Sequence, residues 1–250
     1  MLSFLHRAAA PPATAAVPPG TRVYAVGDVH GRLDLLDTLL ARIDADDAAR
    51  GPAATAIVLL GDLVDRGPDS AGVLARVRRL MAERPGTRLL LGNHEEVFAR
   101  ALAGDADGLR AFCRMGGRET ALSYGIDSAQ YERLYYPELL AALAAAVPAA
   151  DRALLAGAED LVEIGDYAFV HAGVDPRAPL AEQQPRHLRW IREPFLNHRG
   201  TLERVVVHGH TVSDAPEFRR HRIGIDTGAW RTGTLTALGL EGAERWIVQT

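Results

Sequence analysis

The chain has 250 residues, 48% of them hydrophobic, with a formal net charge of −4 and a single cysteine, Cys113. A chain of this size and composition can bury the core of one large α/β domain, or of two small ones, without disulfide bonds. The acidic balance, the lack of a basic run and the lack of a long apolar run argue against nucleic-acid-binding and membrane-spanning classes. A single cysteine excludes an intrachain disulfide and fits a reducing compartment. We expect a cytoplasmic monomer with neither nucleic acid nor a membrane as its partner.

The first 20 residues are rich in alanine and proline. Pro11, Pro12, Pro18 and Pro19 interrupt the continuous apolar segment that a signal peptide needs. The composition also lacks the periodicity of a helix or strand. We therefore predict a disordered arm over residues 1–20 and a single domain over residues 21–250.

The first half of this domain repeats a strand, a loop and a helix. Apolar runs predict strands over residues 21–26, 56–60 and 87–91. Apolar residues at helical spacing predict one helix after residue 33 and another over about 70–83. Such repeats are typical of a parallel sheet with right-handed crossovers.

The middle of the chain, residues 97–157, is rich in alanine and leucine. We predict a helical insertion there that covers one side of the sheet, with a turn at residues 115–120. Short apolar runs then predict further strands, at residues 161–164, 167–170, 204–207, 222–225, 234–238 and 246–248. The fold class is therefore α/β, with a mainly β C-terminal half that closes a second sheet on the first.

Polar motifs that contain glycine follow five of these strands. They are Gly27-Asp28-Val29-His30-Gly31, Gly61-Asp62-Leu63-Val64-Asp65-Arg66-Gly67, Gly92-Asn93-His94-Glu95, His171-Ala172-Gly173 and His208-Gly209-His210-Thr211. Open α/β folds place ligands at such strand ends. A single motif of this kind would be an ordinary turn, but five in one chain predict a shared site.

The side chains in these motifs offer carboxylate, amide and imidazole ligands, without a thiolate. This set favours Mn²⁺, Fe or Zn²⁺. One carboxylate flanked by two ligand sets indicates a binuclear centre, in which cations ~3.5–4 Å apart clamp an in-line displacement at phosphorus.

The motifs closely resemble those of the phosphoprotein phosphatase (PPP) branch of the calcineurin-like metallophosphoesterases. The fingerprints GDxHG, GDxVDRG and GNHE of that branch match residues 27–31, 61–67 and 92–95. The chain looks most like the compact bacterial and phage protein Ser/Thr phosphatases. Further motifs agree in order: Gly116-Gly117-Arg118-Glu119-Thr120, Trp190-Ile191-Arg192-Glu193 and Ile225-Asp226-Thr227-Gly228-Ala229. The resemblance implies a calcineurin-like metallophosphoesterase β-sandwich flanked by helices, with a binuclear metal site at the strand ends.

The resemblance also implies a ligand set for two divalent cations, most simply Mn²⁺, with Fe or Zn²⁺ as alternatives. Asp28 and His30 would bind the first cation, and Asp62 would bridge both. Asn93, His171 and His210 would complete the second. A water that bridges two such cations becomes hydroxide near neutral pH and would attack phosphorus directly.

The remaining motif residues have implied roles in catalysis and substrate binding. His94 would be the general acid that protonates the leaving alkoxide, oriented by Asp65. Arg66 and Arg192 would hold the phosphate oxygens, because guanidinium forks suit a phosphate dianion, and Asn93 would lie beside the substrate.

The implied activity is hydrolysis of phosphoserine and phosphothreonine monoesters, with phosphotyrosine left open. The alternatives are a symmetrical diadenosine tetraphosphate hydrolase, a nonspecific phosphomonoesterase acting on small phosphate esters, and a catalytically silent metal-binding scaffold. The intact ligand set and the His94–Asp65 pair argue against the scaffold, because a scaffold has no need of a general acid.

Five further side chains near the motifs are less clearly assigned. We expect His208 to lie behind the ligands or in packing, and His187 and His198 to face solvent. For Trp190 and Trp230 the sequence leaves two interpretations open, the wall of the cleft and the core.

Overall fold

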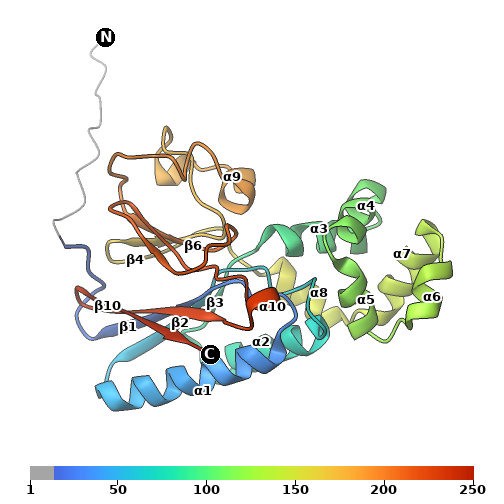
Figure 1. The fold of residues 1–250 in the computed structure, drawn as a ribbon, viewed down its shortest axis with the longest axis horizontal. Coiled ribbons are helices and arrows are strands. Elements are labelled where there is room, and N and C mark those ends of the chain that lie inside the picture. The colour runs from blue at the N-terminus through green and yellow to red at the C-terminus, as the bar shows by residue number, and fades with distance from the viewer. Residues whose placement is uncertain (1–13) are drawn as a thin grey trace, which may run out of the picture.

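Two five-stranded sheets lie at the centre of the structure, a computed structural model that describes residues 14–250 (Figure 1). The first sheet has the order β10-β9-β1-β2-β3, and the second has the order β4-β5-β6-β8-β7. The sheets pack face to face, which confirms the predicted sandwich.

The first sheet contains the predicted parallel repeat. β1 (Thr21–Val26), β2 (Ala54–Leu59) and β3 (Arg88–Leu89) are parallel, with α1 (Leu33–Arg50) and α2 (Ser70–Glu83) between them. β3 is shorter than predicted: the Leu90 N–H still donates to Leu59 O of β2 at 2.9 Å, but Leu90 itself pairs with Glu159 in an isolated bridge outside the strand. A hairpin of β9 (Thr236–Glu241) and β10 (Glu244–Gln249) completes the sheet, with β9 antiparallel to β1.

Successive side chains of a strand point to opposite faces of its sheet, so the residues of β1 contribute to two different layers of the core. Tyr24 and Val26 of β1 face α1 and α2, which cover the outer face of the first sheet (Figure 1). Val23 and Ala25 face the second sheet instead. Both faces of β1 are therefore buried, and its carboxyl end is held in a fixed place.

The second sheet consists of short strands: β4 (Val162–Ile164), β5 (Tyr167–Phe169), β6 (Val205–His208), β7 (Glu217–Phe218) and β8 (Arg222–Gly224). β5, β6 and β8 are mutually parallel, so their carboxyl ends lie at one edge. Three short helices were not predicted: η1 (Leu180–Glu182) and α9 (Pro185–Trp190) lie between β5 and β6, and α10 (Ala229–Thr232) lies between β8 and β9 of the first sheet.

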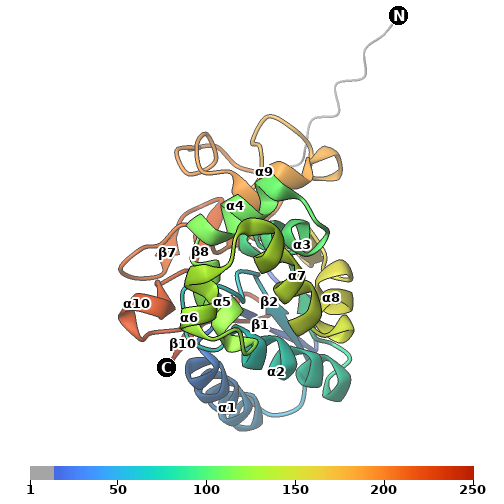
Figure 2. The ribbon, with the colours of Figure 1, turned by 90° about the vertical axis from the view of Figure 1, so that its right-hand side faces the viewer.

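The middle of the chain forms six helices: α3 (Asn93–Leu102), α4 (Ala106–Arg114), α5 (Gly117–Ser123), α6 (Ser128–Arg133), α7 (Tyr136–Ala146) and α8 (Ala149–Ala156). They pack on one another and on α2 as a lobe beside the sandwich, and they do not cover a sheet face as predicted (Figures 1 and 2). The predicted turn at 115–120 is confined to its start, because Gly116 adopts a left-handed conformation (φ 102°) and α5 begins at Gly117.

The helices of the lobe can be tested for the length and apolar composition of a membrane span. Within residues 14–250, no single helix is long and apolar enough to cross a bilayer. α7 and α8 reach that composition only when taken together, and they are bent by 94° at their junction.

The prediction of a disordered arm over residues 1–20 is wrong for its last seven residues. Ala15 and Val17 are only 3% and 2% exposed and pack in the core between the sheets. The Val17 N–H donates to Gly242 O (2.9 Å), and the Ala16 N–H donates to an Asp166 carboxylate oxygen (3.0 Å). Composition did not reveal this, because both partners lie far along the chain. The rest of the predicted arm lies outside the described residues.

We expect deletion of residues 1–19 to destabilise the protein. Burial of a valine side chain is worth about 1.5–3 kcal/mol, and the two backbone hydrogen bonds add to this. With a shift of roughly 2–4 °C per kcal/mol for a chain of this size, the melting temperature should fall by about 5–10 °C. Thermal unfolding of the deletion variant against full-length protein measures the effect.

Two point variants make this test specific. Val17→Ala should reproduce part of the loss, whereas Thr14→Ala changes an exposed side chain and should leave the melting temperature unchanged. An unchanged melting temperature in the deletion variant would mean that the segment contributes nothing to folding.

Candidate metal centre

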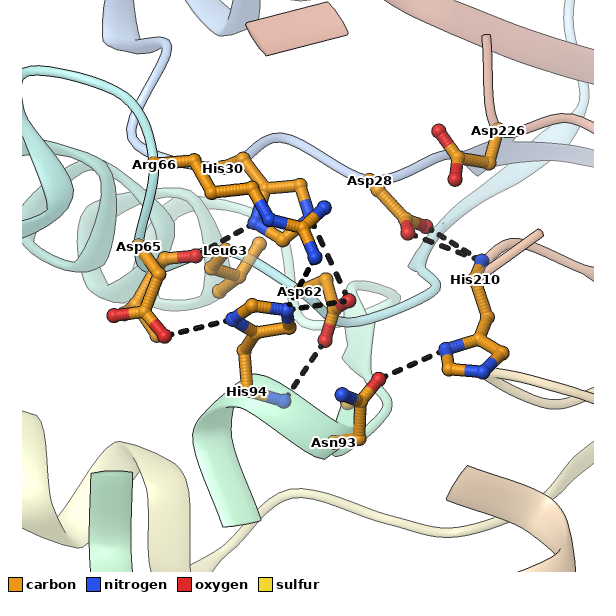
Figure 3. A network of polar contacts seen from close by, with 12 residues as sticks. Asp28, His30, Asp62, Leu63, Asp65, Arg66, Asn93, His94, His210 and Asp226 are labelled. Atoms are coloured by element: carbon orange, nitrogen blue, oxygen red, sulfur yellow. Dashed lines mark hydrogen bonds and ion pairs between the residues drawn. The ribbon is translucent and has the colours of Figure 1, made fainter. Parts of the chain in front are cut away.

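The polar motifs meet where the carboxyl ends of β1, β2, β5 and β6 approach the start of α3 (Figure 3). The loops are tied together by their backbones: the N–H groups of Val29 and His30 both donate to Asp62 O, at 3.0 and 2.8 Å. Glycine permits the close approach, since a Cβ on Gly209 would lie 2.0 Å from Asp28 Oδ1. The predicted site residues that follow the strands therefore gather in one place.

The backbone of the site is strained in a recurrent way. Within residues 14–250, the non-glycine residues with positive φ are all predicted site residues: His30, Asp62, Asp65, Arg66 and His210. Such left-handed positions cost of order 1–3 kcal/mol each and persist where the surrounding structure fixes them. Two of these residues are neighbours in sequence, Asp65 and Arg66, and both contact the His94 ring.

Four ligand atoms converge in the half of the site around Asn93. Asn93 Oδ1 lies 3.0 Å from His171 Nε2 and 2.8 Å from His210 Nδ1, and His171 Nε2 lies 3.4 Å from Asp62 Oδ1. Ligands at ~2.1 Å from one cation, at right angles to each other, are about 3 Å apart. The spacing therefore fits a single divalent cation.

The proton arrangement supports the same conclusion. His171 Nδ1 faces Leu60 O at 2.8 Å, so a neutral ring donates there and leaves Nε2 without a proton. Nε2 then faces two further acceptor oxygens, those of Asn93 and Asp62. Three acceptors pointing at one another repel unless a cation lies between them.

The other half of the site is built around His30. Its Nδ1 contacts Val64 O at 2.8 Å, and its Nε2 lies 3.6 Å from Asp62 Oδ2. The Arg66 guanidinium lies against this half and contacts the Nε2 atoms of both His30 and His94, at 2.9 Å each (Figure 3). A positive charge therefore already lies among these imidazole nitrogens.

The two groups of potential ligands share one residue. Ligand atoms of His30, Asp62 and His94 lie within 4.8 Å of one another, and so do those of Asp62, His171 and His210. Asp62 is thus the residue that both groups share, and its role as a bridging ligand stays a prediction. The first group contains His94 and not Asp28, although Asp28 was the predicted ligand there, and its role as a ligand stays a prediction.

Asp28 lies at the far side of the site, beside Asp226 (Figure 3). Its carboxylate accepts the His210 N–H, at 3.2 Å to Oδ1 and 3.0 Å to Oδ2. Burial raises the pKa of Asp28 well above its usual value, and the carboxylates of Asp226 and Asp62 raise it further. Buried carboxylates packed this closely need either protons or cations, so the cluster fits divalent metal ions.

The histidines of the site are in the form that binds metals. Burial lowers the pKa of His171 to about 4 and that of His210 to about 2. Both rings are therefore neutral at neutral pH, as metal ligation requires. The residues present thus fit a pair of divalent cations with oxygen and nitrogen ligands.

His94 and Asp65 form a buried pair next to these ligands. His94 Nδ1 lies 2.7 Å from Asp65 Oδ2, and Thr120 Oγ1 donates to Asp65 Oδ1 at 2.7 Å. Asp65 therefore fixes the ring so that Nε2 points into the site, 3.9 Å from Asp62 Oδ2. Burial lowers the pKa of His94 to about 4, and the Asp62 carboxylate opposes this shift.

A family model for calcineurin-like phosphoesterases matches residues 21–229. The chain belongs to this family. That membership confirms the predicted family and the predicted metallophosphoesterase fold, and it makes the chain a hydrolytic, metal-binding phosphoesterase.

Part of the sequence is also similar to that of individual curated proteins. A symmetrical bis(5′-nucleosyl)-tetraphosphatase of Yersinia enterocolitica is 46% identical over 81 residues, which is 32% of this chain and 25% of that protein. The match thus spans only about a quarter of the curated relative.

Solved structures resemble the phosphoesterase over most of its length. A protein provisionally named a diadenosine tetraphosphatase shares 23% identity with a TM-score of 0.61, covering 96% of this chain and 95% of its own. A cold-active protein tyrosine phosphatase shares 20% identity with a TM-score of 0.57, covering 93% and 81%. At these identities the structures support the fold alone.

Glu95 is a residue of the phosphoesterase site to which the sequence assigned no role. Its fully buried carboxylate accepts four backbone N–H groups, those of Asp62, Leu63, Val64 and Gly92, at 2.7–3.1 Å. Burial and the Asp62 charge raise its pKa to about 8, and the backbone donors oppose that shift. Glu95 therefore fixes the loop that carries Asp62.

We expect Glu95→Gln to loosen this loop. The new amide group would face N–H donors and leave two of them unsatisfied, at about 1–3 kcal/mol each. Thermal unfolding should show this loss, and the affinity for cations should fall because Asp62 is no longer held in place. Glu96→Gln, at the half-exposed next position, is the matched control. Equal behaviour of the two variants would contradict the positioning role.

Other predicted residues lie around the centre. Arg192 is exposed, and its role in binding phosphate stays a prediction. His208 is buried behind the ligands as expected, with Nδ1 3.0 Å from Gly209 O and Nε2 3.3 Å from an Arg222 nitrogen.

The structure also places the remaining histidines and tryptophans. His187 and His198, which we expected to face solvent, are partly exposed. Trp190 and Trp230 are each 39% exposed, so the core interpretation is wrong for both. The Trp230 ring lies 5.5 Å from the Arg66 guanidinium, which places it at the edge of the site.

Thr120 and Asp226 are the further site residues to which the sequence assigned no role. Each lies in a motif, Gly116-Gly117-Arg118-Glu119-Thr120 and Ile225-Asp226-Thr227-Gly228-Ala229, that matched the family in order. That match was the available signal, but their partners Asp65 and Asp28 became evident only in the structure.

Proposed function

We propose that the phosphoesterase hydrolyses phosphate monoesters of poor leaving groups, phosphoserine and phosphothreonine above all, by direct attack of water on phosphorus. The observation that carries this proposal is the buried His94–Asp65 pair, 2.7 Å apart, with His94 Nε2 aimed at the bridging position. A serine alkoxide cannot leave without a proton, and this pair is built to supply one.

Each part of the centre has a distinct task in the proposal. Two divalent cations, held by Asp28, His30, Asp62, Asn93, His171 and His210, would acidify a water molecule and neutralise phosphate charge. Mn²⁺ suits this oxygen and nitrogen ligand set, with Fe and Zn²⁺ as alternatives. Arg66 and Arg192 bind the phosphate oxygens, the former through the guanidinium that now contacts the imidazoles of His30 and His94.

The proton follows a short route. Without substrate the buried His94 ring is neutral, and its Nε2 accepts from the Arg66 guanidinium at 2.9 Å. Once Arg66 binds the phosphate instead, Nε2 is free to take up a proton, and Asp65, which accepts from His94 Nδ1–H, stabilises the resulting imidazolium. His94 then donates its Nε2 proton to the leaving oxygen and becomes neutral. Because Thr120 donates to the other oxygen of Asp65, the carboxylate keeps its orientation through this change.

A second candidate is symmetrical hydrolysis of a dinucleoside tetraphosphate. It is favoured by the Yersinia tetraphosphatase, which is 46% identical over the matched segment, and by the name of the structure with TM-score 0.61. The same centre would serve, but the leaving group would then be a nucleoside diphosphate, which departs more easily than an alkoxide.

Turnover of metal-loaded protein on a phosphoserine peptide, a phosphotyrosine peptide and diadenosine tetraphosphate separates the candidates. We expect the phosphoserine peptide to give the highest kcat/KM, and chelation followed by Mn²⁺ to abolish and restore activity. Preference for the tetraphosphate would select the second candidate. Activity that survives complete metal removal would refute both.

A further inference from the structure

The Arg66 guanidinium, which would bind the phosphate, contacts two imidazoles and one indole ring. Its two terminal nitrogens lie 2.9 Å from His30 Nε2 and 2.9 Å from His94 Nε2 (Figure 3). Its central carbon lies over the Trp230 ring, 5.5 Å from the ring centroid. The guanidinium is thus held between the candidate metal centre and an aromatic side chain at the edge of the site.

The two imidazole contacts cannot last through turnover in the proposed function. His30 would bind a cation through Nε2, since its Nδ1 faces Val64 O at 2.8 Å. His94 Nε2 would carry the proton for the leaving oxygen. Neither nitrogen can then accept from Arg66, and phosphate oxygens would take their place. The indole ring of Trp230 has no other task in the site, so its contact with the guanidinium can persist while phosphate is bound.

The backbone end of Arg66 is already fixed by the helical lobe. The Arg66 N–H donates to Gly116 O at 3.1 Å. A Cβ on Gly116 would lie 2.9 Å from Arg66 Cγ, so the turn before α5 packs directly against the start of this side chain. The rest of an arginine side chain is long and flexible, and ordering it costs conformational entropy. A contact at the tip of the side chain therefore decides how often the guanidinium is in place.

Trp230 lies on a short helix, α10, that is anchored in the fold. The preceding residue, Ala229, is 1% exposed, and its carbonyl oxygen accepts from the Arg32 guanidinium at 3.1 Å. At the other end of the helix, Thr232 Oγ1 donates to Thr227 O at 3.0 Å. The backbone that carries the indole is therefore held in a fixed place beside Arg66, while the ring itself is partly open to solvent.

A guanidinium within about 6 Å of an indole centroid is attracted to the face of the ring, and tryptophan gives the strongest attraction of the aromatic residues. We propose that Trp230 is a positioning residue that holds the Arg66 guanidinium in place for a phosphate group. This inference rests on the phosphate-binding role proposed for Arg66. It assigns to Trp230 an action through Arg66, so the affinity for phosphate should depend on the ring whatever organic group the phosphate carries.

Calorimetry with orthophosphate and metal-loaded full-length protein tests the inference without any turnover. We expect Trp230→Ala to weaken orthophosphate binding about three- to tenfold, as the loss of a partly exposed cation–π contact would. Trp230→Phe should recover most of the affinity because an aromatic ring remains, whereas Trp230→Leu restores only apolar bulk and should not. Wild-type affinity in Trp230→Ala would overturn the inference, and so would equal recovery in the phenylalanine and leucine variants.

A double-mutant cycle separates action through Arg66 from direct contact with the ligand. In an Arg66→Ala background, Trp230→Ala should weaken orthophosphate binding no further. An undiminished loss in that background would overturn the inference, because Trp230 would then act on the ligand by another route.

Steady-state kinetics provide a second measure of the same distinction. Trp230→Ala should raise KM by the same factor on a phosphoserine peptide and on an aryl phosphate, with kcat changed less than about twofold, because the lost binding is uniform. A different factor on each substrate would make Trp230 a contact of the organic group and would contradict the positioning role.

The matched control is Phe218→Ala, which removes an exposed aromatic side chain on β7. It should change neither the affinity for orthophosphate nor KM. The melting temperature and metal content of every variant are measured as well. If Trp230→Ala lost phosphate affinity only together with a cation, the inference would be wrong, since the effect would then pass through the metal centre.

The positioning role and the proposed function can fail separately. Protein whose orthophosphate affinity depends on Trp230 and Arg66, but which hydrolyses no phosphate ester, would retain the positioning role and lose the function. Protein that hydrolyses a phosphoserine peptide with Mn²⁺, and does so equally well in the Trp230→Ala variant, would retain the function and lose the positioning role.

Discussion

Asp62→Asn is expected to abolish binding of both divalent cations and to lower kcat by about a thousandfold or more. Asp62 is shared by both groups of ligand atoms, so a neutral amide weakens both sites at once. Several kcal/mol of charge stabilisation depends on the cations, and each 1.36 kcal/mol is tenfold in rate. Metal analysis and steady-state kinetics on an aryl phosphate measure the two losses.

The metal-free form supplies the control for this variant. Without cations, Asp62 is a buried carboxylate near Asp28 and Asp226, and burial raises its pKa. Removal of its charge should therefore leave the chelated variant at least as heat-stable as the chelated wild type. Asp28→Asn should weaken one cation more than the other. Two tightly bound metals and normal turnover in Asp62→Asn would disprove the bridging assignment.

His94→Asn is expected to lower kcat on a phosphoserine peptide by ~10²–10⁴-fold, the usual range for loss of a general acid. The loss should be clearly smaller on an activated aryl phosphate, because a phenolate leaves without a proton. KM should change little, since Arg66 and Arg192 still bind phosphate. Parallel kinetics on both substrates, with metal analysis of the same protein, provide the measurement.

Asp65→Asn should show the same pattern in a milder form. The amide cannot accept from His94 Nδ1–H with the nitrogen facing the ring, so the imidazole loses the partner that fixes it. Equal rate losses on both substrates would argue against acid catalysis. Loss of a metal in His94→Asn would make His94 a ligand, in keeping with its proximity to His30 and Asp62.

The spacing of apolar residues and the turn residues at segment ends were enough to predict the longer helices and strands. α2 has the predicted bounds because Asp69 caps its first turn, where it accepts the Gly72 N–H at 2.8 Å, and Pro85-Gly86 follows it. β7 was missed because two residues show no periodicity. The segment at Val17 was missed because its burial depends on Gly242, which composition cannot connect to it.

The convergence of the site residues was predictable from topology, since parallel strands end at one edge of a sheet. The hydrogen bonds that hold these residues in place could not be predicted from the sequence. Glu95 acts on backbone N–H groups and Thr120 on a carboxylate 55 positions away, and neither leaves a signal in spacing. The sequence also could not show that Arg66 lies among the imidazoles, because that depends on its left-handed backbone.

The position of β1 between β2 and β9 has a consequence for how the protein is made. β2 is synthesised soon after β1, but β9 begins roughly 200 residues later. At ribosomal rates of ~5–20 residues per second, one edge of β1 stays unpaired for on the order of 10–40 s. During that interval β1, the strand that precedes Asp28, is an open edge, which other chains can pair with. The nascent chain therefore needs protection at this edge until its last hairpin has left the ribosome.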